Sequence, residues 1–161
     1  MSEDHIAPAA IAALIERESI RELKARYCRF LDGKDEESWR SVFTLDVRVR
    51  TDIGAATGSA PARSFTLEGV DAFVPAVLAT LAGVTTVHHC HTSEITLTSA
   101  TTAGGIWAMA DRLIYSDGRE LHGAGHYHET YEKSGGTWRI SSLHLTRLHV
   151  KLIGDWTNAP A

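Results

Sequence analysis

The chain has 161 residues and a formal net charge of −4, from 16 Lys and Arg against 20 Asp and Glu. Hydrophobic residues make up 43% and charged residues 22%, which is ordinary globular usage and excludes a disordered chain. No basic stripe points to nucleic acid, and no apolar run approaches the ~18 residues of a membrane span. We expect a cytoplasmic protein without a signal peptide, with one domain over 1–161 and its core within 8–150.

The first third of the chain has the pattern of helices. Apolar residues recur near a 3.6-residue period over 8–31, which predicts a long helix and leaves open a break within 16–19. Gly33 suits the C′ position that ends this helix. Asp35 is expected to cap a short second helix.

The middle of the chain is mixed. Apolar residues alternate over 45–53, which predicts a strand. The small and turn-forming residues of 54–66 predict a loop. A further helix is expected over 67–81, with a kink at Pro75.

From residue 85 onward the pattern changes to long strands. Their expected ranges are 85–98, 104–116, 119–133 and 137–150. The turns at Asp117-Gly118 and at 134–136 are short, so the last three strands should form antiparallel hairpins. Helices followed by a strand meander predict an α+β domain. Strands that curl around the helices would leave a cone-shaped cavity, which is a natural site for a small-molecule substrate.

Two residues near the end of the long helix are candidates for catalysis. Asp32 lies in the last turn, where the helix macrodipole and partial burial would raise the pKa of its carboxyl. Tyr27 lies five residues earlier on the apolar stripe. The alternatives are a solvated turn aspartate and a core tyrosine whose hydroxyl is satisfied within the protein.

Eight of the nine histidines lie in the second half of the chain. In the run 87–91, alternation places His88 and Cys90 on one face of a strand and the other two histidines on the opposite face. An inward imidazole near an acid is the simplest general base near pH 7, although a buried histidine bonded to backbone gives the same pattern. Cys28 and Cys90 are expected to be buried free thiols in a reducing cytoplasm.

Two charged residues fall on the apolar faces of later strands. Asp111 shares its face with Trp107 and Met109, and a carboxylate in that position needs a partner or a perturbed pKa. Arg147 shares its face with apolar residues of the last strand and could pair with Asp111. Such an ion pair would either act on the substrate in the cavity or only stabilise the fold.

One histidine segment imitates a metal motif. His126 and His128, with Glu132 four residues on, match part of the metal-binding pattern of cupins. The flanking glycine spacing fails, and a helical first third does not suit a jelly roll, so no metal site is expected. Alternation should send both histidines outward and turn Tyr127 and Glu129 toward the cavity.

The ensemble of these segments resembles the SnoaL-like branch of the NTF2-like superfamily, over roughly residues 8 to 150. The likeness rests on IRELKARY at 20–27, LDGKD at 31–35, Trp39, TVHH at 86–89, GHYHE at 125–129 and GTWRI at 136–140. The resemblance implies a cystatin-like α+β cone, in which N-terminal helices pack on a strongly curved, mixed but mostly antiparallel sheet.

Within that superfamily the pattern is most similar to scytalone dehydratase and the bile acid 7α-dehydratases. This resemblance implies a catalytic set of Tyr27, Asp32, His88, Asp111 and Arg147. The sequence departs from scytalone dehydratase in having Asp111 where that enzyme has a histidine. It also lacks a second tyrosine in the first strand, LDVRVRTDI. We expect the substrate to be bound by Trp107, Met109, Tyr127 and Glu129.

The resemblance implies a lyase of the dehydratase type that acts on a small cyclic or aromatic hydroxy or carbonyl substrate. His88 would be the base, Asp32 would orient it, and Tyr27 would stabilise the enolate. No cofactor is expected, because the sequence has no Gly-rich phosphate loop and no closed ligand set. An isomerase or cyclase with the same enolate chemistry is one alternative, and a non-catalytic small-molecule-binding module is another.

The outward face of the sheet predicts self-association. His89, Ile114, His126, His128 and Thr130 alternate onto that face and are neither charged nor clearly solvent-like. Such a face fits a partly polar interface, so we expect a homo-oligomer. The resemblance to the dehydratases favours a trimer over a dimer.

Overall fold

The computed structural model describes residues 8–53 and 63–156. Within these ranges the elements are α1 (Pro8–Asp32), α2 (Glu36–Ser41), β1 (Phe43–Ile53), β2 (Arg63–Glu68), α3 (Val70–Thr80), β3 (Thr85–Leu97), β4 (Thr102–Ile114), β5 (Glu120–Ser134) and β6 (Thr137–Ile153). Among the described residues, no helix is long and apolar enough to cross a membrane.

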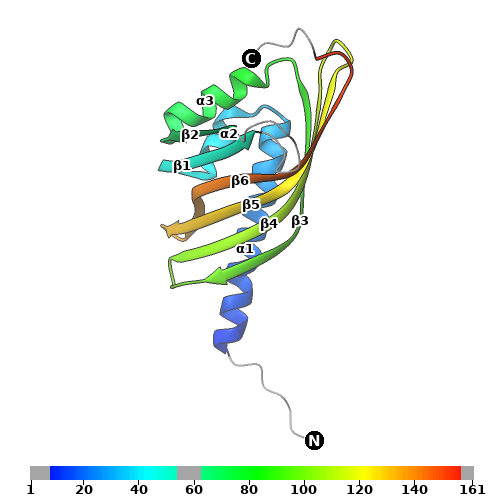
Figure 1. Ribbon diagram of the computed structural model, residues 1–161. Coiled ribbons are helices and arrows are strands. Elements are labelled where there is room, and N and C mark those ends of the chain that lie inside the picture. The colour runs from blue at the N-terminus through cyan, green and yellow to red at the C-terminus, as the bar shows by residue number, and fades with distance from the viewer. Residues whose placement is uncertain (1–7, 54–62, 157–161) are drawn as a thin grey trace, which may run out of the picture.

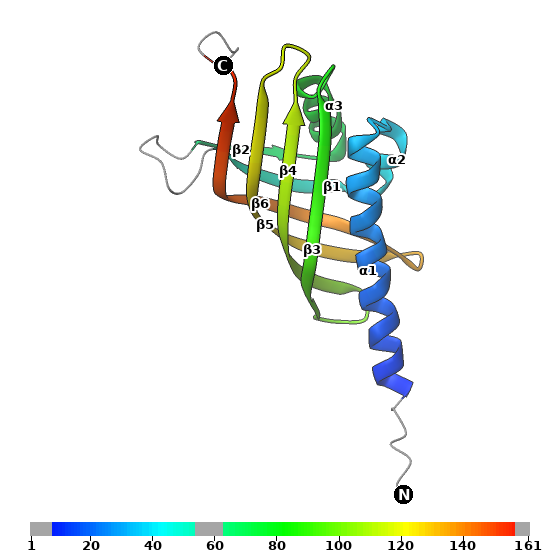
Figure 2. The same cartoon turned by 90° about the vertical axis from the view of Figure 1, so that its right-hand side faces the viewer.

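All six described strands join one mixed sheet in the order β2-β1-β6-β5-β4-β3. β1 runs parallel to β6, and the other neighbouring strands are antiparallel. The sheet is strongly curved and the helices lie on its concave side (Figure 1). Figure 2 shows α1 running alongside β3, so the helix end and this strand face one another. The predicted α+β architecture is confirmed.

Irregular pairing accompanies the bending of the long strands. On β6, Leu148 has no partner, since Arg147 pairs with Gly125 and the next paired residue is His149 opposite Ala124. An extra residue of this kind is a β-bulge, which bends a strand and increases its twist. A Cβ atom at Gly125 would overlap the backbone carbonyl of Thr146, so the close approach of the strands requires glycine there.

The apolar stripe of α1 divides into two parts. Ile20, Leu23, Tyr27 and Leu31 are buried in the core under the sheet. The residues of the same stripe in the first turns, Ile11, Leu14 and Ile15, are 47%, 57% and 60% exposed. They are exposed because α1 begins beyond the end of the sheet (Figure 1), where no described element covers them.

The end of α1 differs in detail from the prediction. The helix is continuous from Pro8, without a break over 16–19. The residue in the left-handed conformation is Lys34 (φ 55°), not Gly33. Backbone hydrogen bonds hold this turn, including the one that Asp35 N donates to the Phe30 carbonyl at 3.0 Å. Asp35 then caps α2 as predicted, by accepting a hydrogen bond from Ser38 N at 3.1 Å.

The predicted loop over 54–66 is wrong at its end, because 63–66 belong to β2. β2 is a strand because it pairs with the edge of β1. The local run of small and polar residues gives no sign of that pairing. The rest of that loop lies outside the described residues. α3 is shorter than expected, and the four later strands agree with their predicted ranges within a few residues.

Candidate active site

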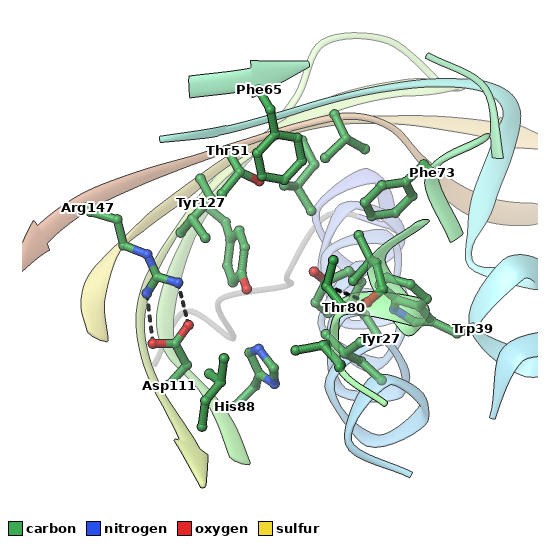
Figure 3. Close-up of a pocket in the computed structure, with 17 residues that line it drawn as sticks. Tyr27, Trp39, Thr51, Phe65, Phe73, Thr80, His88, Asp111, Tyr127 and Arg147 are labelled. Carbon is green, nitrogen blue, oxygen red and sulfur yellow. Dashed lines mark hydrogen bonds and ion pairs between the residues drawn. The ribbon is translucent and has the colours of Figure 1, made fainter. Parts of the chain in front are cut away.

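A cavity of about 170 Å³ lies between the concave face of the sheet and the helices. Its walls are mostly apolar, with side chains such as Leu31, Phe73, Leu113 and Leu145. The polar groups on its wall come from Tyr27, Trp39, Thr51, Thr80, His88, Asp111, Tyr127 and Arg147. Figure 3 shows Asp111, Arg147 and Tyr127 on the sheet side, with Tyr27, Trp39 and Phe73 opposite. An apolar cavity with a few converging polar groups is typical of a small-molecule site.

The predicted contact between Asp32 and His88 is present at the edge of this cavity. His88 Nδ1 lies 2.6 Å from Asp32 Oδ1, and the backbone N–H of His88 donates to Oδ2 at 2.9 Å. Thr86 Oγ1 donates to Oδ1 at 2.9 Å. The contact forms because Asp32 ends α1 at the point where this helix meets β3. Three donors from one strand therefore fix the carboxylate.

The pKa of Asp32 moves in the opposite direction from the prediction. Partial burial acts to raise this pKa, but the hydrogen bonds from His88 and Thr86, together with the imidazole charge, outweigh burial and lower it. The expected effect of the helix macrodipole is therefore not the one that decides the protonation state. Asp32 is an ionised acceptor at neutral pH, which suits an orienting role rather than a proton donor.

The contact with Asp32 fixes the orientation of the His88 ring. An ionised carboxylate only accepts hydrogen bonds, so Nδ1 of His88 carries the hydrogen in this contact. Nε2 has no hydrogen-bond partner among the described residues. The side chain is 8% exposed, and the ring lines the cavity (Figure 3). The ring thus presents an unoccupied nitrogen to the cavity, which is the arrangement that a general base would need.

A second ion pair forms the wall beside His88. Asp111 pairs with His88 across β3 and β4, and its carboxylate binds the Arg147 guanidinium in a bidentate manner, at 2.7 and 2.6 Å. Both side chains are largely buried, with exposed fractions of 2% and 12%. Burial acts to lower the pKa of Arg147, but the hydrogen bonds and charge of Asp111 outweigh it and raise this pKa. Arg147 therefore keeps its charge in this contact.

Gly123 makes room for this ion pair. It pairs with Asp111 across β4 and β5, and the guanidinium reaches over it from β6. A Cβ atom at Gly123 would overlap both Arg147 Nη1 and Asp111 Oδ1. The bidentate geometry therefore depends on the missing side chain in the strand between the two partners.

Two tyrosines line the cavity from opposite sides. Tyr27 comes from α1 and Tyr127 from β5, and their ring centroids lie 5.8 Å apart at an interplanar angle of 72°. Burial raises the pKa of both phenols well above the ordinary value of 10.0. Both hydroxyls therefore stay protonated and remain able to donate a hydrogen bond to a substrate oxygen.

Sequence reasoning missed a buried cation behind these rings. The Lys24 ammonium lies 3.9 Å from the ring centroid of Tyr27 and 3.6 Å from that of Tyr127. It forms an ion pair with Glu129, whose other carboxylate oxygen accepts the hydroxyl of Tyr131. Lys24 falls between Leu23 and Tyr27 on the buried side of α1, and this position is the signal that could have revealed it.

The predicted substrate-binding residues divide between two regions. Tyr127 lines the cavity, whereas Trp107, Met109 and Glu129 are not among its lining residues. Trp107 instead donates to Tyr131 at 2.7 Å, and Glu129 binds Lys24. These three side chains share the inner face of the sheet as predicted, but the curvature places them in the packed core.

Trp39 lines the cavity although its role was not predicted. Its side chain is fully buried between Tyr27, Phe43 and Phe73. Its Nε1 has no hydrogen-bond partner among the described residues. A buried donor without a partner costs free energy, so this N–H group is a cost to the fold.

The remaining histidines of β5 and β6 lie on the outer face of the sheet. His128 stands between His126 and His144, with ring centroids 6.2 and 6.0 Å apart, and His144 Nε2 contacts Asp52 at 3.0 Å. In the described part of the chain, no group of three or more His, Cys, Asp or Glu side chains converges as a metal site requires.

Comparisons with known proteins agree with this architecture. The sequence matches the model of the SnoaL-like domain over residues 12–144. FGR4 from Gibberella zeae, a cyclase homologue, is 29% identical over 92% of this chain and 97% of its own length.

Two solved structures share the fold. A scytalone-dehydratase-like protein from Novosphingobium aromaticivorans has a TM-score of 0.75 at 22% identity, over 88% of this chain and 90% of its own. A type 2 hexachlorocyclohexane dehydrochlorinase (LinA) has a TM-score of 0.73 at 19% identity, over 94% and 97% of the two chains. The chain therefore belongs to the SnoaL-like domain family, and its helices and six-stranded mixed sheet form an NTF2-like α+β cone.

Proposed function

We propose that this protein is a cofactor-independent lyase of the dehydratase type, which abstracts a proton from its substrate and eliminates a β-leaving group. The observation that carries the proposal is His88. Its Nδ1 is held by Asp32 at 2.6 Å, while its ring faces an apolar cavity with Nε2 uncommitted. The family includes enzymes, and two structural relatives bear the names of elimination enzymes, a dehydratase and a dehydrochlorinase.

The proposed reaction begins with proton abstraction beside a carbonyl or phenol group. Nε2 of His88 takes the proton, and the Asp32 carboxylate stabilises the imidazolium that forms. The Tyr27 hydroxyl donates to the substrate oxygen, on which enolate charge develops. The imidazolium of His88 then returns a proton to the departing hydroxyl group, so that water leaves and the base is restored.

The charges around the cavity favour a neutral substrate. Arg147 lines the cavity, but both of its terminal nitrogens already bind the Asp111 carboxylate. Because the Asp111 carboxylate already neutralises the guanidinium, a carboxylate or phosphate on the substrate would be buried without an opposite charge of its own, which is costly. We therefore propose a small, neutral, cyclic hydroxy-ketone or phenol, with its apolar body against Phe73 and Leu145 and its oxygens toward the polar groups.

An isomerase or cyclase is the alternative function. The 29% identity with the cyclase homologue favours this reading, since both reactions begin with the same enolate. The two functions differ in the fate of the enolate. A lyase expels a leaving group, whereas an isomerase returns the proton to another carbon and a cyclase forms a carbon–carbon bond.

The test uses a panel of neutral cyclic β-hydroxyketones in deuterated water. Deuterium incorporation next to the carbonyl reports proton abstraction, and formation of the conjugated enone reports elimination. We expect His88→Ala to lower both rates by ~10²–10⁴-fold, which is the usual contribution of a general base. Dialysis against a chelator should leave the rates unchanged.

His149→Ala is the matched control, because this histidine is exposed on β6 and does not line the cavity. It should retain wild-type rates. Exchange without enone formation would favour the isomerase or cyclase. Tight binding of the ketones without exchange in the wild-type protein would contradict an enzyme and favour a binding module.

We also propose that the protein is a homo-oligomer, with a trimer favoured over a dimer. His89, His128 and Thr130 are exposed on the outer face of the sheet, and Ile106 between them is 38% exposed. Light scattering at micromolar concentration should give about three times the 17.6 kDa of one chain. A value near 17.6 kDa would contradict any oligomer, and a value near twice that mass would contradict the trimer.

A further inference from the structure

The two cysteines of the chain meet in the structure. Cys28 lies on α1 and Cys90 on β3, and their Sγ atoms are 3.5 Å apart. Both are free thiols of intermediate exposure that pack against the edge of the core. Neither lines the cavity, and the proposed mechanism uses neither.

This thiol pair lies next to the Asp32–His88 pair. Cys28 precedes Asp32 by one helical turn, and Cys90 follows His88 by two residues on the same side of β3. One turn of helix rises about 5.4 Å and two strand residues span about 6.6 Å, so the two pairs are successive contacts between the same elements. A covalent bond at the sulfurs would therefore join the two elements that hold the base and its partner.

We propose that Cys28 and Cys90 are a redox modification site, at which a peroxide converts the two thiols into a disulfide that joins α1 to β3. The Cys90 thiolate attacks hydrogen peroxide, which forms a sulfenic acid and releases hydroxide. The Cys28 sulfur then attacks the sulfenic sulfur as its proton passes to the departing hydroxyl group, so that water leaves as the S–S bond forms. The two thiols lose two electrons and two protons, and one peroxide becomes two waters.

The surroundings of the two sulfur atoms favour different roles for them in the proposed oxidation. A hydrogen bond from Cys28 and the nearby charge of Lys24 lower the pKa of Cys90, against the opposing effect of burial. The hydrogen bond to Cys90 and burial raise the pKa of Cys28. In the proposed reaction we therefore assign Cys90 as the sulfur that meets the oxidant and Cys28 as the resolving sulfur.

The distance suits such a bond. The sulfur atoms must close from 3.5 Å to about 2.05 Å for the bond to form. The bond closes a long loop, since the cysteines are 62 residues apart, and a cross-link over a long loop restricts the unfolded chain strongly. Oxidation should therefore stabilise the protein rather than unfold it.

The experiment treats the full chain with hydrogen peroxide and then with dithiothreitol. We expect both thiols to disappear together, the intact mass to fall by two hydrogens, and a peptide map to link Cys28 to Cys90. The Tm should rise by roughly 4–10 °C, as for a native-like disulfide in a domain of this size. Dithiothreitol should reverse each change.

Single serine variants separate this reaction from ordinary thiol oxidation. Cys28→Ser should give oxygen adducts on Cys90 without a cross-link, and Cys90→Ser should react with peroxide far more slowly. The proposal is overturned if both wild-type thiols stay free while the urea-unfolded chain is oxidised. It is also overturned if Cys90 is oxidised to a sulfinic acid without cross-linking, or if the cross-link lowers the Tm. None of these outcomes depends on the lyase activity.

Discussion

Two groups of buried charges lie close together in the core. They differ in whether any of their polar atoms remains free to bind a ligand. Around Lys24 and Glu129 every charged atom is occupied. The ammonium binds the carboxylate between two tyrosine rings, and Tyr131 occupies the second carboxylate oxygen. Around the cavity, His88 binds Asp32 through one nitrogen and presents the other to an open space.

The difference shows that burial of charge does not by itself mark a catalytic site. Lys24 is 1% exposed and Glu129 is 4% exposed, and both are more buried than Asp32 or Arg147. A closed network of this kind can only stabilise the fold or the position of the rings that it touches. A reacting group must keep an unoccupied atom beside a cavity, as His88 does.

Breaking the closed network should have the largest effect on stability. Lys24→Met leaves the Glu129 carboxylate buried without its partner, so the free energy of unfolding should fall by ~3–5 kcal/mol in urea titrations. The double variant Lys24→Met, Glu129→Leu should recover most of this loss. A single variant as stable as wild type would contradict the role assigned to the pair.

A methyl group at Gly123 should disturb the charges of the cavity specifically. Gly123→Ala forces Arg147 and Asp111 apart, and overpacking of this kind costs ~1–3 kcal/mol in urea unfolding. We also expect weaker substrate binding, visible as a higher KM. Gly104→Ala is the matched control on the neighbouring strand, because its Cβ would meet only the Glu129 carbonyl at 3.8 Å. Equal effects of the two variants would contradict a specific need for glycine at position 123.

The Asp32 contact should produce the smallest effect on stability, and one that depends on pH. The folded pKa of Asp32 lies below its unfolded value of about 3.9, so the ionised contact contributes its full stability above that pH. This contribution is lost as the pH falls through the folded pKa. The stability difference between wild type and Asp32→Asn should therefore be constant at neutral pH and disappear in acid. A difference that grows as the pH falls would mean that the pKa is raised instead.

The sequence by itself determined the helix-then-strand order and most element boundaries. Alternation over the last four strands and the periodicity of α1 are local patterns, because a side chain's face depends only on the geometry of its own element. The Asp35 cap and the glycine turns at 117–118 and 134–136 are local for the same reason. The family resemblance supplied Tyr27, Asp32, His88, Asp111 and Arg147, and all of these except Asp32 line one cavity.

The tertiary structure decided the features that depend on distant partners. Asp32 lies 56 residues from His88, and only their contact reverses the pKa shift that the helix end predicts. Lys24 lies 105 residues from Glu129, so no local pattern could assign that carboxylate to the core instead of the cavity. The strand over 63–66 forms only because β1 is its partner. Glycine is needed at position 123 because the Arg147 guanidinium reaches across it from β6. Side-chain faces are properties of single elements, whereas partners, pKa directions and free space are properties of several elements brought together by the curvature of the sheet.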